Sequence, residues 1–439
     1  MLKSFLGGIH PNGNKKYTEE MAIETMPLPS RVIIPMRQHI GAPCTPVVQV
    51  GDVVKKGQIL ARSDSFVSSP IHASISGKVT AIQSAPHTSG IDCTSVIIES
   101  DGADEWEEGL LCERDYKNLT KAEIMDIIKA AGIVGMGGAT FPTHIKLSPG
   151  EDKKIDTFIL NAAECEPYLT ADYRMMLEYQ ERIVTGVLIA MKVLGVEKAI
   201  IGIEDNKPEA VKSMQQAFSQ TAVKVAALPT KYPQGAEKML IKVLTGREVP
   251  QGMLPGDVGV VVQNVGTVVA ICDAVEKGIP LIERVTTISG DAVKEPKNLL
   301  IRIGTTFQEA FDVCGGFDKT PEKIIMGGPM MGFAQSTLEV PVIKGVSGIL
   351  ALSESAVNHD EQSPCIRCGR CVEACPMGLI PSMLSILGER DKFEKAKEEY
   401  GLMNCIECGS CVYTCPAKRN IVQYIRLLKA QNASQATKK

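Results

Sequence analysis

The spacing of apolar positions changes character several times along the chain. Between residues 30 and 100, short apolar runs are separated by Gly-Asp and Lys-Gly pairs, which predicts short β-strands joined by tight turns. Between residues 120 and 280, strand-like apolar runs alternate with stretches of helical periodicity, the pattern of an α/β region. Residues 281–335 return to β-type runs. The chain is therefore expected to fold as several domains.

The α/β region opens with a helix start signal. Thr120 is followed three residues later by Glu123, which is the spacing of a capping box, and the helix is expected to continue through Ala131. Downstream, strands are expected at residues 155–160, 198–203 and 222–228, and helices at 182–194 and 210–218.

The last third of the chain mixes β-type and helical patterns. Strands are expected at 284–290 and 323–329, a short helix at 306–313, a polar linker at 353–362, and helices at 383–399 and 421–428. The tail after these elements is polar and is expected to be frayed.

Composition excludes some classes of protein. With 439 residues the chain has room for roughly three domains of ordinary size. Its 44% hydrophobic and 22% charged residues are typical of a globular protein. The net charge of −4 comes without a basic stripe, so no nucleic-acid partner is expected. No signal peptide and no transmembrane span are expected, because no stretch has the about 20 apolar residues that a span needs.

Eight of the 14 cysteines form two runs of one pattern, C-x2-C-x2-C-x3-C-P. This run binds [4Fe–4S] clusters in bacterial ferredoxins, and its fourth cysteine ligates the other cluster of the pair. Zinc is the alternative, but it usually takes paired C-x2-C units, and two complete runs with trailing prolines fit it poorly. We therefore expect one cluster on Cys365, Cys368, Cys371 and Cys415, and a second on Cys405, Cys408, Cys411 and Cys375.

Residues 47–60 and 69–79 resemble the barrel-sandwich fold of lipoyl and biotinyl carrier domains. Those domains present a modifiable lysine in a hairpin. The corresponding hairpin here, Ser65–Ser69, contains no lysine. A structural β domain is therefore favoured over a carrier function.

A glycine-rich loop, residues 132–146, ends in Lys146. Glycines let peptide N–H groups approach a phosphate closely, and a helix N-terminus adds a favourable dipole. The loop follows a helix, whereas the dinucleotide-binding fingerprint follows a strand. A simple tight turn is the other interpretation of such a loop.

The segment resembles the flavin-bearing, NADH-binding subunit of respiratory complex I and, more closely, the C-subunit family of Rnf electron-transport complexes. Further segments match in order: 161–167 with Asp172 downstream, 232–237, and 262–267. The opening residues 5–11 and the β-rich residues 281–335 are also similar, the latter to a β-grasp domain. The resemblance covers nearly the whole chain.

The resemblance implies a set of site residues. The FMN phosphate is expected at Gly135, Gly137, Gly138 and Lys146, and the ribityl chain and ring at Asn161, Asn264 and Thr267. Glu164, Glu166 and Glu237 are expected to line the flavin and nicotinamide side as catalytic residues, with Tyr232 and Gly235 among the cofactor-binding residues and Phe141 stacked on the nucleotide.

Some of these residues have simpler interpretations. For each carboxylate the simpler interpretation is a solvated or helix-capping group, and for Phe141 it is ordinary packing in the core. Met136, Ala163 and Ala236 also stand where complex I usually has Arg, Asp and Glu. With these changes an FMN site is still expected, whereas the nucleotide contacts are expected to differ from those of complex I.

The fold class implied is a multidomain α/β protein. It comprises a barrel-sandwich β domain (1–115), an FMN/NADH-binding α/β domain (116–280), a β-grasp domain (281–350), a helical two-cluster ferredoxin domain (351–430) and a tail (431–439).

The function implied by the resemblance is that of a peripheral subunit of a membrane ferredoxin:NAD⁺ oxidoreductase. Such a subunit lies on the cytoplasmic face and passes electrons between two [4Fe–4S] clusters, FMN and NAD(H). Its expected partners are membrane subunits that translocate ions and a ferredoxin-reacting subunit. Two alternatives share the layout: a cobalamin reductase, and a pure electron-transfer module without a working nucleotide site.

Overall fold

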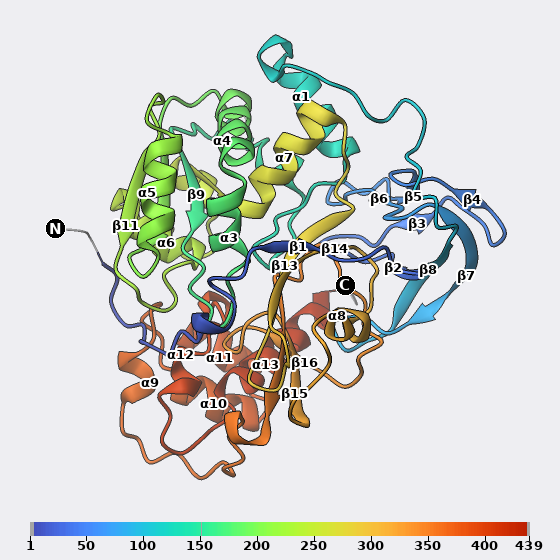
Figure 1. Cartoon of the computed structure of the whole chain (residues 1–439). Helices are drawn as coiled ribbons and strands as arrows, with labels where there is room; N and C mark the ends of the chain where they lie inside the picture. Colours follow the sequence, from blue (N-terminus) through green and yellow to red (C-terminus); the bar gives the residue numbers. More distant parts are fainter. Residues whose placement is uncertain (1–3, 151, 437–439) are drawn as a thin grey trace.

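The computed structural model describes residues 4–150 and 152–436 (Figure 1). Its N-terminal β domain consists of two small sheets, with strand orders β2-β8-β7-β4 and β3-β5-β6. The strands are β2 (Arg31–Pro35), β3 (Thr45–Pro46), β4 (Val53–Val54), β5 (Ile59–Arg62), β6 (Ile71–His72), β7 (Gly77–Ala85) and β8 (Cys93–Ser100). Buried side chains such as Ile34, Leu60 and Ile98 form one core from both sheets.

The second domain is built on a four-stranded parallel sheet of order β11-β10-β9-β12. Its strands are β9 (Thr157–Ala162), β10 (Ala199–Glu204), β11 (Lys224–Leu228) and β12 (Val260–Asn264). Its helices are α1 (Lys121–Ala130), α2 (Thr143–Lys146), α3 (Ala171–Glu178), α4 (Gln180–Leu194), α5 (Pro208–Ala217), α6 (Glu237–Thr245) and α7 (Val265–Lys277).

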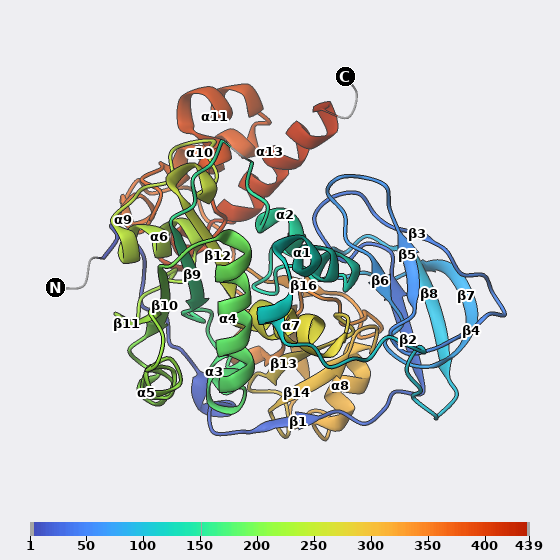
Figure 2. The same cartoon turned by 90° about the horizontal axis from the view of Figure 1, so that it is seen from above.

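Alternating residues of the central strand β9 enter two different cores. Phe158 and Leu160 belong to the core shared with α1, α4 and α7, whereas Ile159 packs with residues of α6. Helices thus cover both faces of the sheet, as expected for parallel strands (Figure 2). The capping box at Thr120 is present. Strand β9 lies two residues later than predicted, which places Asn161 within the strand.

The third region is a six-stranded sheet of order β1-β14-β13-β17-β15-β16, flanked by α8 (Phe307–Val313). Its strands are β1 (Ile23–Thr25), β13 (Glu283–Ser289), β14 (Lys297–Arg302), β15 (Pro321–Met326), β16 (Phe333–Gln335) and β17 (Gly348–Ser353). The sequence pattern did not predict β1, β14, β16 and β17. Strand β1 is three residues long and is a strand only because it pairs with β14, nearly 300 residues away in the chain.

The C-terminal region is helical. It contains α9 (Arg370–Glu373), α10 (Pro381–Glu389), α11 (Phe393–Tyr400), α12 (Ser410–Tyr413) and α13 (Ile421–Ala436). Short 3₁₀ helices along the chain are η1 (Lys15–Tyr17), η2 (Tyr116–Asn118), η3 (Pro255–Val258), η4 (Glu354–Ala356) and η5 (Leu402–Asn404).

Two predictions for this region need correction. The single helix expected at 383–399 is two helices, α10 and α11, because Asp391 between them has a left-handed φ of 50° that interrupts the helix. The frayed tail expected from residue 431 is helical as far as Ala436, where α13 ends. The prediction for residues 437–439 lies outside the described residues.

The cluster region and the N-terminal β domain lie on different sides of the molecule (Figures 1 and 2), and in Figure 1 strands of the six-stranded sheet lie between them. The first described residues run from the α/β domain along the cluster region before they reach β1. Within the described part of the chain, no helix has both the length and the apolar character needed to cross a bilayer.

Candidate functional site

The α/β sheet has a topological switch point between β9 and β12. From β9 the chain moves outward on one side through β10 and β11, and it then returns to place β12 on the other side of β9. In open α/β sheets, ligands bind in the crevice at such a point, outside the carboxyl ends of the strands. Asn161 and Asn264 are paired in register at these two strand ends. The sheet therefore brings two of the predicted cofactor-binding residues together.

The glycine loop is held over this point by backbone and side-chain contacts. The Gly135 N–H donates to the Phe141 carbonyl at 2.9 Å, and the Met136 N–H donates to Thr267 Oγ1 at 2.9 Å. A Cβ atom on Gly137 would lie 3.3 Å from the Asn264 Cβ. Thr267 is fully buried, so in this structure it positions the loop and does not face the crevice.

The tip of the loop is open. Gly137, Gly138 and Ala139 are exposed, and Gly138 has a φ of +107° with nothing within 4 Å of where a Cβ would be. Across the described residues, the peptide N–H groups of these three residues have no hydrogen-bond partner. Peptide N–H groups without a protein partner suit an anion. The loop therefore fits the phosphate of FMN.

Two cations from beyond the α/β sheet support the loop from behind. Arg284 of β13 is buried, and its guanidinium donates to the Met136 carbonyl at 3.5 Å. Lys344 is also buried, and its ammonium donates to the Gly132 carbonyl at 2.6 Å and to the Pro70 carbonyl at 2.9 Å. Burial lowers the pKa of Lys344 to about 7. Neither cation was predicted from the sequence, because no local pattern links them to the loop.

The two asparagines at the strand ends are already hydrogen-bonded. Asn161 Nδ2 donates to the Gly235 carbonyl at 2.8 Å. Asn264 caps α7 by accepting from the Gly266 N–H at 2.9 Å, and its Nδ2 donates to Asp172 at 2.6 Å. These contacts fix the orientation of both side chains and tie the segments around residues 161, 235 and 264 into one site.

Lys146 and Glu237 meet at the edge of the crevice. Lys146 ends the short helix α2, and its Nζ lies 2.6 Å from Oε1 of Glu237, the first residue of α6. The two side chains are 28% and 37% exposed, so both remain accessible to a ligand. Phe141 is half-buried at the end of the glycine loop.

Glu164 follows β9 in a left-handed conformation with a φ of 48°. Its carboxylate caps α3, because it accepts from the Asp172 N–H at 2.7 Å and the Tyr173 N–H at 3.3 Å. Burial raises the pKa of Glu164, and nearby Asp172 raises it further, whereas the ammonium of Lys15 opposes the shift. The helix-capping interpretation of this carboxylate is therefore the one that the hydrogen bonds support.

Two lysines hold the segment after β9 in place. Lys15 Nζ donates to the carbonyls of Glu164 and Glu166 at 2.8 Å and to that of Leu169 at 2.6 Å. Lys207 is buried and donates to the Ala163 carbonyl at 2.8 Å. Neither lysine was predicted from the sequence. Lys15 lies just after the opening motif, but only the tertiary fold brings it to this segment.

Glu166 lies at a junction of three regions. Its carboxylate accepts from the N–H groups of Met330 and Met331, at 3.1 and 2.9 Å, in the turn between β15 and β16. The buried Tyr232 hydroxyl donates to the Cys408 carbonyl at 2.7 Å and lies 3.4 Å from Glu166 Oε1. Burial raises the pKa of Glu166 to about 7. In this structure Glu166 and Tyr232 therefore connect the α/β domain to the cluster region.

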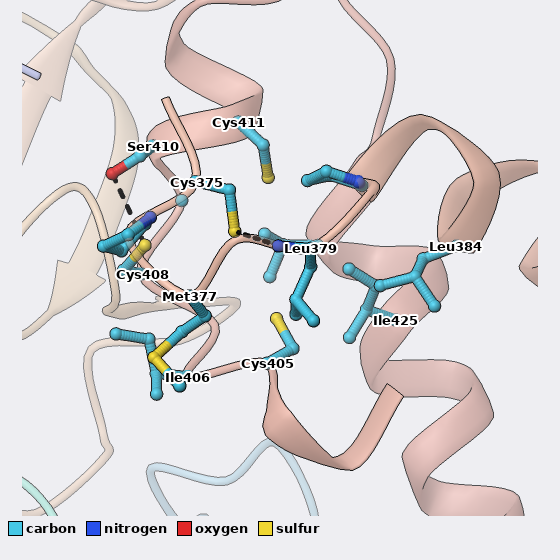
Figure 3. A pocket seen from close by; sticks show the side chains of 14 residues that line it. Cys375, Met377, Leu379, Leu384, Cys405, Ile406, Cys408, Ser410, Cys411 and Ile425 are labelled. Atoms are coloured by element: carbon cyan, nitrogen blue, oxygen red, sulfur yellow. Dashed lines mark hydrogen bonds between the residues drawn. The ribbon is translucent and has the colours of Figure 1, made fainter. Parts of the chain in front are cut away.

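The second cysteine run surrounds a hollow (Figure 3). Cys375, Cys405, Cys408 and Cys411 line this hollow together with apolar side chains such as Leu379 and Ile425. The Cys375 sulfur accepts from the Leu379 N–H at 3.4 Å. Among the described residues, no three His, Cys, Asp or Glu side chains are grouped so as to hold a single metal ion. The four cysteines are instead spread around the hollow.

The chemistry of this hollow fits a cubane cluster. Burial raises the pKa of the Cys411 thiol, and the neighbouring Cys405, Cys408 and Cys375 raise it further. Four thiols become thiolates together only when a bound metal centre offsets their repulsion. Cys375 comes from the first run and the other three from the second, so the four meet as the crossed ligand pattern requires.

We propose that the first run forms the corresponding group. Burial is the main cause that raises the pKa of the Cys371 thiol, and the nearby Cys415 and Cys365 raise it further. Cys368 is exposed. Cys415 belongs to the second run, so this group would also be crossed. The relay would thus have one buried and one exposed end.

Metal analysis tests the number of clusters. Two cubanes require about eight iron and eight acid-labile sulfur atoms per chain. We expect these values for the anaerobically purified or reconstituted chain, measured by colorimetric iron and sulfide assays. Zinc in place of iron, without labile sulfide, would contradict the assignment.

Four parts of the chain match known families. Residues 3–103 match the RnfC barrel sandwich hybrid domain, residues 128–273 the Nuo51 FMN-binding domain, residues 285–334 the SLBB domain and residues 357–416 the 4Fe-4S dicluster domain. These matches confirm the expected FMN-binding and two-cluster regions. All four expected types of region are present in a mixed α/β fold.

Whole-length relatives agree with these matches. The chain is 66% identical to the C subunit of the proton-translocating ferredoxin:NAD(+) oxidoreductase complex of Clostridium ljungdahlii, over 98% of this chain and 94% of the relative. It is 49% identical to the C subunit of the Na(+)-translocating ferredoxin:NAD(+) oxidoreductase complex of Acetobacterium woodii, over 99% and 98%.

Among solved structures, a chain of an NAD+-reducing [NiFe]-hydrogenase in the H2-reduced state has a similar fold. Its TM-score is 0.52 at 19% identity, over 71% of this chain and 63% of that chain. The resemblance expected from the glycine loop and the cysteine runs is confirmed by the two relatives. The chain belongs to the family of C subunits of ion-translocating ferredoxin:NAD⁺ oxidoreductase complexes, the Rnf family.

Proposed function

We propose that this chain exchanges electrons between NAD(H) and two [4Fe–4S] clusters through FMN, as a peripheral subunit of a membrane ferredoxin:NAD⁺ oxidoreductase. FMN, when bound, exchanges a hydride with the nicotinamide and single electrons with the clusters. The protein supplies binding, orientation and the electrostatic environment. The partners would be membrane subunits of the same complex, which translocate the ion, and a ferredoxin-reacting subunit. The chain would lie on the cytoplasmic face.

The observation that carries this proposal is the position of Tyr232. Its segment pairs with Ile9 through two backbone hydrogen bonds of 2.8 and 2.9 Å and leads directly to Gly235, the hydrogen-bond partner of Asn161. Its hydroxyl donates to the Cys408 carbonyl. One short segment, residues 232–235, thus links the hydrogen-bond partner of Asn161 at the crevice to a cysteine of the buried hollow. A flavin in the crevice and a cluster in the hollow would be neighbours.

The residues around the crevice have distinct proposed roles. The free N–H groups of Gly137 and Gly138 would bind the FMN phosphate, with Lys146 adding positive charge. Asn161 and Asn264 would orient the ribityl chain and ring. Glu237 would face the flavin and nicotinamide side. Thr267 acts indirectly, because it holds the loop.

The acidic segment after β9 would act mainly through position. Glu164 keeps α3 in register at the crevice, and Lys15 and Lys207 fix the carbonyls of the same segment. Glu166 keeps the β15–β16 turn against the cluster region. We infer that these carboxylates set the distance between the flavin and the buried cluster.

Ion specificity would reside in the partner subunits. One relative is named for protons and another for Na⁺, although both are similar to this chain over almost its whole length. A subunit whose described helices include no membrane span fits the electron-carrying part of such a complex.

Anaerobic reduction by NADH tests the proposed function. The purified chain, reconstituted with FMN, iron and sulfide, is mixed with NADH while the flavin absorbance is followed. We expect bleaching of bound FMN, followed by the EPR signal of reduced [4Fe–4S] clusters. Clusters that dithionite reduces but NADH does not would indicate a pure electron-transfer module, and the proposed function would then be wrong.

A further inference from the structure

The loops of the two cysteine runs are copies of each other in sequence and backbone. Both read Cys-Ile-x-Cys-Gly. Arg367 and Glu407 occupy the same position and both have a φ of 57°, while Gly369 and Gly409 have φ values of 80° and 78°. The two loops therefore present equivalent faces, and their surroundings can be compared position by position.

The face of the second loop is covered by other parts of the chain. The Cys408 carbonyl accepts from the Tyr232 hydroxyl at 2.7 Å. A Cβ atom on Gly409 would lie 2.8 Å from the carbonyl oxygen of Met330. Glu407 is paired with Arg426 at 3.0 Å and with Lys429 at 2.7 Å. This face is the contact through which the buried cluster meets the α/β domain.

The face of the first loop is open. Cys368 is exposed, Ile366 is 66% exposed, and nothing lies within 4 Å of a Cβ placed on Gly369. Arg367 and Arg370 are exposed, and neither has an ion-pair partner in the described ranges 4–150 and 152–436. The loop thus offers an apolar centre, a cysteine and two unpaired guanidinium groups.

The two loops also differ in charge. Residues 365–373 contain two arginines and one glutamate, a net charge of +1, whereas residues 405–413 contain one glutamate, a net charge of −1. In the covered loop, the negative charge of Glu407 is paired with Arg426 and Lys429 of the same chain. In the open loop, the positive charges of Arg367 and Arg370 remain available to pair with a partner molecule.

We propose that the open cluster face, defined as Ile366, Arg367, Cys368, Gly369 and Arg370, docks an acidic ferredoxin-type iron–sulfur domain of a partner subunit. The proposal deepens the proposed function and rests on it. The covered copy of this loop shows how such a face meets its electron-transfer neighbour, and the opposite net charge indicates an acidic partner. Electrostatic attraction of this kind raises the rate of productive encounter.

The transfer at this face is a single-electron step. The reduced cluster of the partner would lose one electron, and the cluster that Cys365, Cys368, Cys371 and Cys415 would hold would gain it. No bond forms or breaks, and no proton is required. From there the electron would continue to the buried cluster.

A charge reversal tests the proposal in the purified complex. With Arg367→Glu/Arg370→Glu, we expect NAD⁺ reduction driven by reduced ferredoxin to fall at least tenfold at low ionic strength. Added salt should reduce the difference, because it screens the new repulsion. NADH:ferricyanide activity, which needs the flavin site alone, should stay unchanged. EPR should show both clusters in the variant.

The matched control is Lys212→Glu/Lys224→Glu, which reverses two exposed charges on α5 and β11. It should behave as wild type. If the Arg367→Glu/Arg370→Glu subunit keeps both clusters but is lost from an otherwise intact complex, this result would also support the docking face.

Ferredoxin-driven turnover of the arginine variant equal to wild type would overturn the proposal. If that variant also no longer sediments with phosphatidylglycerol vesicles, the face is a lipid contact instead. Failure of the proposed function would be seen separately, as the absence of NADH-dependent flavin reduction in the wild-type chain.

Discussion

Replacement of Cys375 by serine is expected to remove the cluster of the second cysteine run, although Cys375 belongs to the first run in sequence. Cys375 lines the same hollow as Cys405, Cys408 and Cys411. A serine hydroxyl is a much poorer ligand than a thiolate for iron–sulfur clusters, which are held by thiolates. The iron content should fall from about eight to about four atoms per chain.

The cluster that is lost determines the functional effect. The hollow of Cys375 borders Cys408, whose carbonyl accepts from the Tyr232 hydroxyl of the flavin region. Without its cluster, the remaining cluster is separated from the flavin crevice. NADH should still bleach FMN in Cys375→Ser, but reduction of the surviving cluster should be strongly slowed. EPR after mixing with NADH, and separately with dithionite, measures the two effects.

Cys415→Ser is the mirror experiment. It should remove the exposed cluster and leave the buried one reducible by NADH. Cys112→Ser, a change of a half-buried cysteine outside both runs, controls for general effects of cysteine replacement. If Cys375→Ser instead removed the cluster of Cys365, Cys368 and Cys371, the crossed pattern would be wrong.

Features set by local rules were predictable from the sequence. The capping box at Thr120 depends on residues three apart, and its helix was placed almost to the residue. The cysteine spacings likewise carry their own geometric information, because three cysteines with two residues between each can ligate three irons of one cluster. The crossed pairing then follows from the general rule for paired runs.

Features set by distant contacts were not predictable in this way. Strand β1 forms because it pairs with β14, and its three residues are too few to show the apolar alternation that predicts a strand. Lys15 and Lys207 reach the segment after β9 from distant parts of the sequence. Their roles depend on where the fold places carbonyl oxygens, which a single sequence does not display.

The candidate site shows the same division. The glycine loop and the two asparagines were found as motifs, and the sheet topology explains why they meet. The roles of the carboxylates were less predictable, since Glu164 caps a helix and Glu166 receives two N–H groups from the β15–β16 turn. A motif identifies a residue type at a site, but the hydrogen-bond partners decide what the residue does there.

Lys146→Ala is expected to weaken FMN binding by roughly tenfold to a hundredfold. A charge-assisted contact is typically worth about 1.5–3 kcal/mol, and about 1.4 kcal/mol corresponds to one decade of affinity. The ammonium would stabilise the phosphate bound by the N–H groups of Gly137 and Gly138. Fluorescence titration of the apo-chain with FMN measures the change, and both clusters should remain intact.

The ion pair with Glu237 supplies the control that separates two explanations. Lys146 lies 2.6 Å from this carboxylate, so its removal also leaves Glu237 unpaired beside the crevice. If Lys146 acts directly on the phosphate, Glu237→Gln should retain FMN or bind it more tightly, because a negative charge is removed and the ammonium is freed. If Lys146 only neutralises Glu237, the double variant Lys146→Ala/Glu237→Gln should recover wild-type affinity. That recovery, or an unchanged affinity in Lys146→Ala alone, would exclude the phosphate role, whereas a persistent loss in the double variant would establish it.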